Sequence, residues 1–172
     1  DSLIEYELQA GFFFSEDQLL PNFENLRDIY GRGFYPGIKL TDVENLIHSC
    51  GFYHGKARDL IGMAKMVRDI YNGTLPDTIE ELTKLPGVGR KTANLIVGDV
   101  YKKPAVVADT HVIRITNLLG LTTSKDPQKV EMQLKKLLPP DESNDFCHRI
   151  VLHGRAVCIA RRPKCAECCL KD

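Results

Sequence analysis

The stretch LPGVGRKTAN (residues 85–94) decides how this chain folds. Short helical patterns lie on both sides of it, at residues 78–84 and 94–102, so the stretch joins two helices through a Gly-x-Gly hairpin. The two glycines allow positive φ angles and let another backbone come close. Free backbone N–H groups at the start of a helix suit an anion, and phosphate is the anion that this arrangement favours. Because Lys91 lies just inside the second helix, the stretch predicts chemistry on a phosphate-bearing polymer.

Composition and charge narrow the class of protein. The chain has 172 residues, 43% of them hydrophobic, which is enough to bury a core in one or two small domains. No apolar run approaches the roughly 20 residues that a membrane span requires, and the acidic start does not favour a signal peptide. The net charge is zero, but residues 1–50 carry nine acids and three bases, whereas residues 51–172 carry 14 acids and 20 bases. This polarity permits a DNA-facing surface, although ordinary solvated charges explain it equally well.

Helical periodicity runs through most of the chain, and almost no strand pattern occurs. Thr78, Asp109 and Asp126 each precede a helical pattern and are predicted to be N-cap residues. The predicted fold class is therefore all-α, with two helical domains. One domain would span residues 10–103 and carry the hairpin, and the other would span residues 104–172, to which residues 1–9 could add.

Cysteines form a second constellation at the C-terminal end. Four of the six lie there with the spacing C-x6-C-x2-C plus one adjacent cysteine: Cys158, Cys165, Cys168 and Cys169. In an intracellular chain such a group favours metal binding over disulfides, and all-thiolate ligation suits an iron–sulfur cluster or zinc. A loop of free thiols is the alternative. Cys50 and Cys147 lie in apolar helical surroundings and are predicted to be buried.

Four ordered motifs carry a resemblance to a known family. They are residues 51–53 (GFY), residues 85–94, residues 107–112 (VADTHV) and residues 152–155 (LHGR), the last leading into the cysteines. Together they resemble the helix–hairpin–helix DNA glycosylases of the endonuclease III type, over roughly residues 42–168. One hairpin alone would be a weak match, but four matches in order and spacing are specific. Such enzymes remove oxidised pyrimidines in base excision repair and cleave the strand at the resulting abasic site.

The resemblance places the catalytic amine at Lys91 and the catalytic carboxylate at Asp109. A glycosidic bond breaks through a cationic sugar, which a carboxylate stabilises, and an unprotonated amine can attack the sugar C1′ to form a Schiff base. The imine acidifies the neighbouring C–H, so β-elimination can cleave the 3′ phosphate. A lysine at position 91 implies the bifunctional glycosylase and AP lyase branch. Taken singly, Lys91 could be a phosphate contact and Asp109 a helix N-cap.

The resemblance also implies double-stranded DNA with damaged bases or abasic sites as the partner, no membrane contact, a monomer, and a cytoplasmic, nucleoid-associated location. The target nucleotide must leave the stack, and Phe52 or Tyr53 could fill the gap as a wedge, unless they pack under their turn. Gln9 is the nearest match to the glutamine that the family inserts into the duplex. The expected hairpin contacts to DNA are Leu85, Gly87, Val88, Gly89 and Arg90.

The family cofactor is a 4Fe-4S cluster, and its cysteine pattern continues as C-x6-C-x2-C-x5-C. The fourth cysteine would fall at position 174, beyond the sequence. Either the chain is trimmed, or Cys169 substitutes as the fourth ligand, or the cluster is lost.

Two other functions fit the same scaffold. A non-catalytic DNA-binding module predicts binding without strand cleavage. A monofunctional mismatch or base-excision glycosylase predicts base release that leaves the abasic strand intact.

Overall fold

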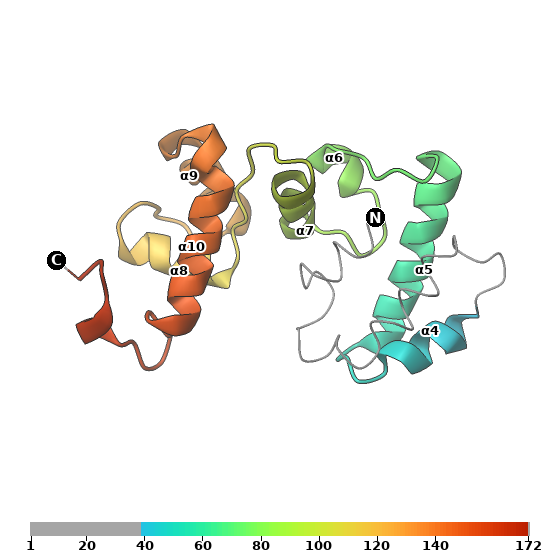
Figure 1. Cartoon of the computed structure of the whole chain (residues 1–172), viewed down its shortest axis with the longest axis horizontal. Helices are drawn as coiled ribbons and strands as arrows, with labels where there is room; N and C mark the ends of the chain where they lie inside the picture. The colour runs from blue at the N-terminus through green and yellow to red at the C-terminus, as the bar shows by residue number, and fades with distance from the viewer. Residues whose placement is uncertain (1–38, 172) are drawn as a thin grey trace. The chain divides into compact units, whose positions relative to one another are not determined.

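The computed structural model describes residues 39–171, and every regular element among them is a helix (Figure 1). This confirms the all-α prediction. No helix within these residues is both long and apolar enough to cross a bilayer. The helices are α4 (Leu40–Ile47), α5 (Tyr53–Ile70), α6 (Ile79–Leu82), α7 (Arg90–Leu95), α8 (Thr110–Leu118), α9 (Pro127–Leu137) and α10 (Ser143–Ala156). A π-helical turn (Ile96–Val100) and two 3-10 turns (Pro140–Glu142 and Cys165–Glu167) complete the list.

Three helices begin at the N-cap residues that the sequence predicts. The hydroxyl of Thr78 accepts a hydrogen bond from the Glu81 backbone N–H at 3.4 Å at the start of α6. The Asp109 carboxylate accepts from the Val112 N–H at 2.7 Å, and the Asp126 carboxylate opens α9 in the same way at 2.8 Å. Each cap satisfies one backbone donor that the first turn of a helix leaves unpaired.

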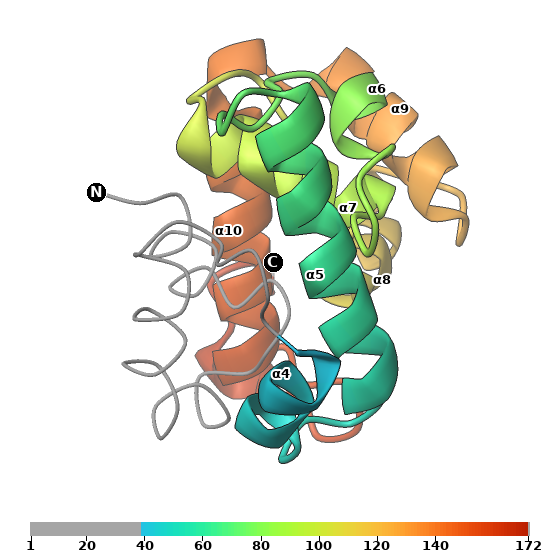
Figure 2. The same cartoon turned by 90° about the vertical axis from the view of Figure 1, so that its right-hand side faces the viewer.

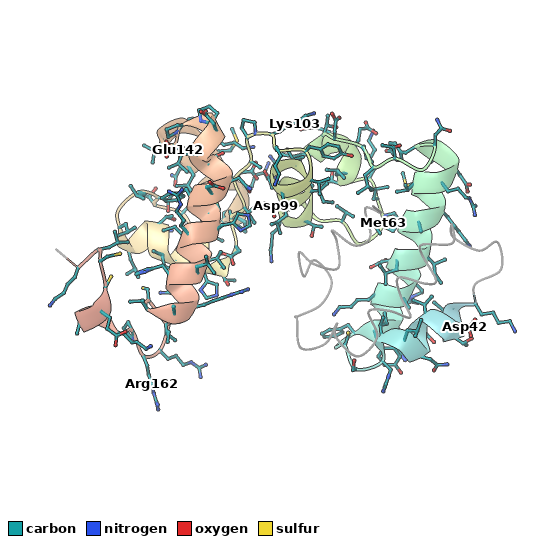
Figure 3. The ribbon with its side chains drawn as sticks, viewed as in Figure 1. Asp42, Met63, Asp99, Lys103, Glu142 and Arg162 are labelled. Carbon is teal, nitrogen blue, oxygen red and sulfur yellow. The ribbon has the colours of Figure 1, made fainter. Side chains whose placement is uncertain are left out.

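The second helix of the hairpin differs from the prediction of residues 94–102. It starts earlier, as α7, and passes directly into the π-helical turn, which ends before Lys102 at φ 53°. A close approach to α10 accompanies the π turn, because a Cβ at Gly98 would lie only 2.4 Å from Asn144 Oδ1. Asp99, labelled in Figure 3, accepts hydrogen bonds on this turn from Asn144 at 2.7 Å and contacts His148 Nε2 at 2.8 Å. A single π-helical turn adds one residue to a helix, and such turns often accompany local constraints of this kind.

The chain divides into two compact units, with the boundary between Gly89 and Arg90. The domain boundary between residues 103 and 104 stays a prediction. In the first unit α4 lies beside the N-terminal end of α5 (Figure 2). Its buried apolar residues come from both helices, from the turn between them and from the segment that follows them: Val43, Ile47, Cys50, Ala57, Leu60, Met63, Leu75, Leu82, Leu85 and Val88.

The second unit is built around the pair α8 and α10, which pack against each other. Gly154 on α10 makes this crossing close, because a Cβ there would lie 2.6 Å from Nδ1 of His111 on α8. The buried segment Ala105–Ala108 leads into α8 and joins its core. That core consists of Val106, Val107, Ala108, Val112, Ile115, Val130, Leu134, Cys147 and Ile150.

Candidate functional site

The hairpin between α6 and α7 is anchored by buried apolar residues, whereas its two glycines are exposed. Leu85 and Val88 are buried, with 2% and 5% of their surface exposed, so their side chains face the protein interior. The Val88 N–H donates to the Leu85 carbonyl at 3.1 Å, and Gly87 adopts φ 75°, which favours glycine. Gly89 is exposed, and no atom of residues 39–171 lies within 4 Å of a Cβ built on it. The described residues therefore leave the space in front of Gly89 empty.

Lys91 lies in the first turn of α7 and is exposed. Within residues 39–171 no hydrogen bond or ion pair engages its ammonium group. The turn itself is fixed, because Ala93 and Asn94 are buried with 0% and 1% exposure. Lys91 thus lies on a turn anchored by buried residues, and its ammonium group is unpaired among residues 39–171.

Asp109 is half-buried at the start of α8. The buried segment Ala105–Ala108 places it, and its own N–H donates to the Val107 carbonyl at 3.0 Å. One carboxylate oxygen, Oδ1, caps the helix through Val112. The N-cap interpretation of Asp109 is therefore correct, and capping the helix does not prevent this carboxylate from having a second role.

The two predicted catalytic residues belong to the same unit, on segments that follow each other along the chain. Lys91 is carried by α7 and Asp109 by the N-cap of α8. In the described part of the chain no direct hydrogen bond or ion pair joins the two side chains. Neither group is neutralised by the other, so both are available to a substrate.

Beside Lys91, the Arg90 guanidinium is paired with the buried carboxylate of Glu131 on α9. Nε of Arg90 donates to Oε2 at 2.7 Å and Nη2 donates to Oε1 at 2.8 Å. Nζ of Lys135 lies 2.7 Å from the same Oε1. Burial acts to raise the pKa of Glu131, but the hydrogen bonds and charges of Arg90 and Lys135 together outweigh burial and hold this pKa below its usual value. Glu131 is therefore a charged group inside the protein at neutral pH.

Sequence reasoning missed Glu131. The only signal was an acidic residue next to Val130 on the apolar side of a predicted helix, which is too weak to identify a buried ion pair. Arg90 itself was expected to contact DNA, and the structure places its side chain 38% exposed and ion-paired.

The turn before α5 separates the two wedge candidates. Phe52 is 94% exposed and adopts φ 60° and ψ 30°, an unusual backbone conformation for a bulky residue. The first turn of α5 holds that conformation, because the N–H groups of Gly55 and Lys56 donate to the Phe52 carbonyl at 3.1 and 3.2 Å. Tyr53 is half-buried, with its ring centroid 4.0 Å from that of His54. Phe52 therefore projects from the turn, whereas Tyr53 packs.

The C-terminal cysteines do not meet in the described structure. Cys165 and Cys169 are exposed, Cys158 accepts a hydrogen bond from Arg114 at 3.3 Å, and the Cys168 sulfur lies 3.5 Å from Nε2 of His153. No group of three or more His, Cys, Asp or Glu side chains among residues 39–171 is arranged to hold a metal. The donor type fits an iron–sulfur cluster or zinc, but the arrangement does not.

The sequence predictions for Cys50, Cys147 and Gln9 have different outcomes. Cys50 and Cys147 are buried, as predicted, with 3% and 2% exposure, and burial raises the pKa of the Cys147 thiol to about 11. In the loop between Cys158 and Cys165, Arg162 is exposed and points away from the ribbon (Figure 3). Gln9 lies outside the described residues.

The chain is similar in sequence to known proteins. An endonuclease III from Synechocystis sp. is 44% identical over 128 residues, which is 74% of this chain and 58% of that protein. An endonuclease III from Thermotoga maritima is 43% identical over 134 residues, 78% of this chain and 63% of that protein. The chain thus spans about three fifths of the length of these curated relatives.

A solved structure and a family profile agree with these relatives. A trapped covalent intermediate of endonuclease III with DNA matches with a TM-score of 0.88 and 34% identity, covering 99% of this chain and 82% of that chain. The profile of the HhH-GPD superfamily of base excision DNA repair proteins matches residues 13–140, which include the hairpin, Lys91, Asp109 and Glu131. The chain therefore belongs to the HhH-GPD superfamily.

Proposed function

We propose that this chain is a base excision repair DNA glycosylase with AP lyase activity, acting on oxidised pyrimidines and abasic sites in double-stranded DNA. The observation that carries the proposal is the pair Lys91 and Asp109. One is an exposed amine on a rigid turn directly after the hairpin, and the other is a charged carboxylate fixed at a helix start. The similarity to proteins named endonuclease III, and to a trapped covalent intermediate of that enzyme with DNA, supports the same chemistry.

The proposed reaction uses these two groups in order. As the bond between the base and C1′ breaks, positive charge develops on the sugar and the Asp109 carboxylate stabilises it. Nζ of Lys91, in its unprotonated form, attacks C1′, the ring opens, and the amine and C1′ form a Schiff base. Loss of a proton from C2′ then forms a double bond between C2′ and C3′, while the C3′–O bond breaks and the 3′ phosphate leaves with that oxygen. Water finally hydrolyses the imine and releases Lys91.

Borohydride trapping tests this proposal. Hydride reduces the imine to a stable amine, so a covalent protein–DNA adduct should form on a duplex with one abasic site and on a duplex with one oxidised pyrimidine. Base release without an adduct or strand cleavage would favour a monofunctional glycosylase. Binding without base release, adduct or cleavage would favour the non-catalytic DNA-binding module.

The hairpin is proposed to bind a DNA phosphate through its backbone. Leu85 and Val88 anchor it, while the exposed glycines leave their N–H groups room to approach an anion. Arg90 and Lys91 add positive charge directly after these glycines in the sequence. A side chain at Gly89 would occupy the space that the phosphate needs.

Gly89→Ala is expected to weaken DNA binding by tenfold or more without lowering stability, because no atom in the described part of the chain lies within 4 Å of the added Cβ. Gly87→Ala is the matched comparison. Since Gly87 has φ 75°, its replacement is expected to cost about 1 kcal/mol of folding free energy. Fluorescence anisotropy with a labelled abasic-site duplex and urea unfolding measure the two effects. Unchanged affinity of Gly89→Ala would exclude close approach of DNA at this glycine.

Phe52 is proposed as the wedge that enters the stack when the target nucleotide leaves it. Unstacking costs a few kcal/mol per step, and an inserted apolar side chain offsets part of this cost. Phe52 alone of the two candidates is free to insert, because it is 94% exposed and held on a fixed turn.

Phe52→Ala is expected to slow base release from a duplex about tenfold or more, with little change on a single-stranded substrate that needs no unstacking. Because the Phe52 side chain is 94% exposed, urea unfolding should be unaffected. Ile70→Ala, another exposed apolar residue of the same unit at 62%, is the control and should keep the wild-type rate. Equal slowing on both substrates would argue against a wedge.

The cysteine loop is a separate proposal. We propose that Cys158, Cys165 and Cys168, whose spacing matches the first three ligands of the family pattern, hold a 4Fe-4S cluster once the loop rearranges, with Cys169 as the candidate fourth ligand. Anaerobic reconstitution followed by iron and sulfide analysis tests it, with Cys165→Ser/Cys168→Ser as the control. Protein that gains no iron and keeps Cys165 and Cys169 reactive to a thiol reagent would overturn it.

The oligomeric state, the location and the domain boundaries complete the proposal. A monomer suffices, because one wedge serves one lesion. The proposed location is the cytoplasm, with association to the nucleoid. The hairpin belongs to a proposed domain of residues 10–103, and Asp109 and the cysteine loop belong to one of residues 104–172.

A further inference from the structure

Glu131 is an unusual residue in the second unit, because its side chain is only 3% exposed and carries a charge. It lies on α9, 41 residues after Arg90, and reaches the segment that carries Lys91. Burying a carboxylate costs several kcal/mol unless it is paired and hydrogen-bonded. Here the pairing is complete, with both oxygens engaged by Arg90.

The contacts of Glu131 lie on both sides of Lys91 along α7. Arg90, one residue before Lys91, forms the two-point pair at 2.7 and 2.8 Å. Asn94, three residues after Lys91, donates its amide to Oε2 of Glu131 at 3.3 Å and to the Arg90 carbonyl at 3.1 Å. One buried carboxylate thus ties both ends of the turn that presents the Lys91 amine.

Stability alone does not require this arrangement. Apolar side chains of similar volume often replace a buried ion pair with no loss of stability. The neighbours of Asn94 on the same turn, Ala93 and Ile96, are already buried apolar residues at 0% and 1% exposure. Asn94 even keeps a buried oxygen, Oδ1, without a hydrogen-bond partner in the described residues. The polar network fixes the orientation of α7. A two-point guanidinium–carboxylate pair has a defined geometry, whereas apolar packing leaves the geometry adjustable.

We infer that Glu131 is a positioning residue for the Schiff-base reaction, holding α7 through Arg90 and Asn94 so that the Lys91 amine meets C1′ in an attacking geometry. The inference rests on the proposed function of Lys91. Glu131 does not touch DNA, since it is buried behind Arg90. A misplacement of about 1 Å at the reacting atom can cost on the order of 100-fold in rate, so a carboxylate distant from the chemistry can control it.

The test is a single-turnover trapping assay at saturating protein, with the dissociation constant for an uncleavable abasic analogue measured separately. Glu131→Gln keeps the shape but loses the charge, and Arg90→Lys keeps the charge but loses the two-point geometry. Both variants are expected to lower the maximal trapping rate between about 10- and 100-fold. The dissociation constant is expected to change far less, because a positioning residue acts on the rate.

Two controls separate positioning from folding and from charge. Lys135→Ala removes the other cation on Glu131, which lies at 2.7 Å but outside α7, and should leave the trapping rate near wild type. The double variant Arg90→Lys/Glu131→Gln should be no slower than the slower single variant, because both changes break one unit. Circular dichroism at the assay temperature verifies that each variant is folded, and Arg90→Lys keeps the test valid if Glu131→Gln does not fold.

The outcomes are distinct. If wild type gives an adduct, Lys91→Ala gives none, and the folded Glu131→Gln and Arg90→Lys variants trap at the wild-type rate, the inference is wrong and the proposed function stands. Effects that multiply in the double variant, or that appear wholly in the dissociation constant, would also overturn it, since they indicate separate contacts. If wild type itself gives no adduct, the proposed function and the inference fail together.

Discussion

Lys91→Ala should yield no borohydride-trapped adduct on an abasic-site duplex, while still folding as the wild type does. Lys91 is exposed and makes no hydrogen bond or ion pair in the described part of the chain, so its replacement by alanine should not lower the free energy of unfolding. The reaction loses the only atom proposed to bond to C1′. Gel electrophoresis after borohydride treatment measures the adduct, and urea unfolding measures stability.

Lys91→Arg distinguishes a nucleophile from a phosphate contact. Arginine keeps the positive charge and can bind a phosphate, but its guanidinium stays protonated and forms no imine. We expect near-wild-type DNA affinity with no adduct. If Lys91→Arg retained strand cleavage and trapping, Lys91 would be a DNA contact and another amine would be the nucleophile.

Asp109→Asn should slow base release by about 100- to 1,000-fold at nearly unchanged stability. Asparagine is as good an N-cap as aspartate, so its side-chain oxygen can still accept the Val112 N–H that Asp109 binds at 2.7 Å. The negative charge that stabilises the cationic sugar is lost, and removing one preorganised electrostatic group at a reacting centre typically costs a factor of this size. Single-turnover base release from a duplex with one oxidised pyrimidine measures the effect.

Asp126→Asn is the matched control, because Asp126 caps α9 through Lys129 at 2.8 Å and has no proposed chemistry. It should leave both stability and base release unchanged. Asp109→Ala removes the cap and the charge together, and it should lose about 1 kcal/mol of folding free energy in addition to the rate. An Asp109→Asn variant that releases base at the wild-type rate would reduce Asp109 to a structural cap.

The prediction of the fold rested on local sequence signals, namely N-cap residues and helical periodicity. Thr78, Asp109 and Asp126 begin helices as predicted, because N-capping depends on residues only three apart in the chain. The buried state of Cys50 and Cys147 followed in the same way from helical periodicity. The roles of Lys91 and Asp109 came from motif spacing and stay predictions until the trapping and base-release assays are done.

Local signals failed where contacts are long-range. The π turn of the hairpin's second helix occurs where Gly98 packs closely on Asn144, 46 residues later in the chain. The metal site that the cysteine spacing predicts stays a prediction, because in the described loop Cys158 accepts a hydrogen bond from Arg114 and the Cys168 sulfur lies 3.5 Å from Nε2 of His153. Spacing specifies which donors are near in sequence and not where their sulfur atoms point.

By itself, then, the sequence determined an all-α chain with a Gly-x-Gly hairpin and defined helix starts, since these depend on propensity, capping and backbone freedom within a few residues. Only the tertiary structure decided that Phe52 projects while Tyr53 packs, and that Glu131 binds Arg90 beside Lys91. The physical reason is that exposure and ion pairing are set by which distant segments meet, and a buried carboxylate becomes stable only when its partners arrive from another helix.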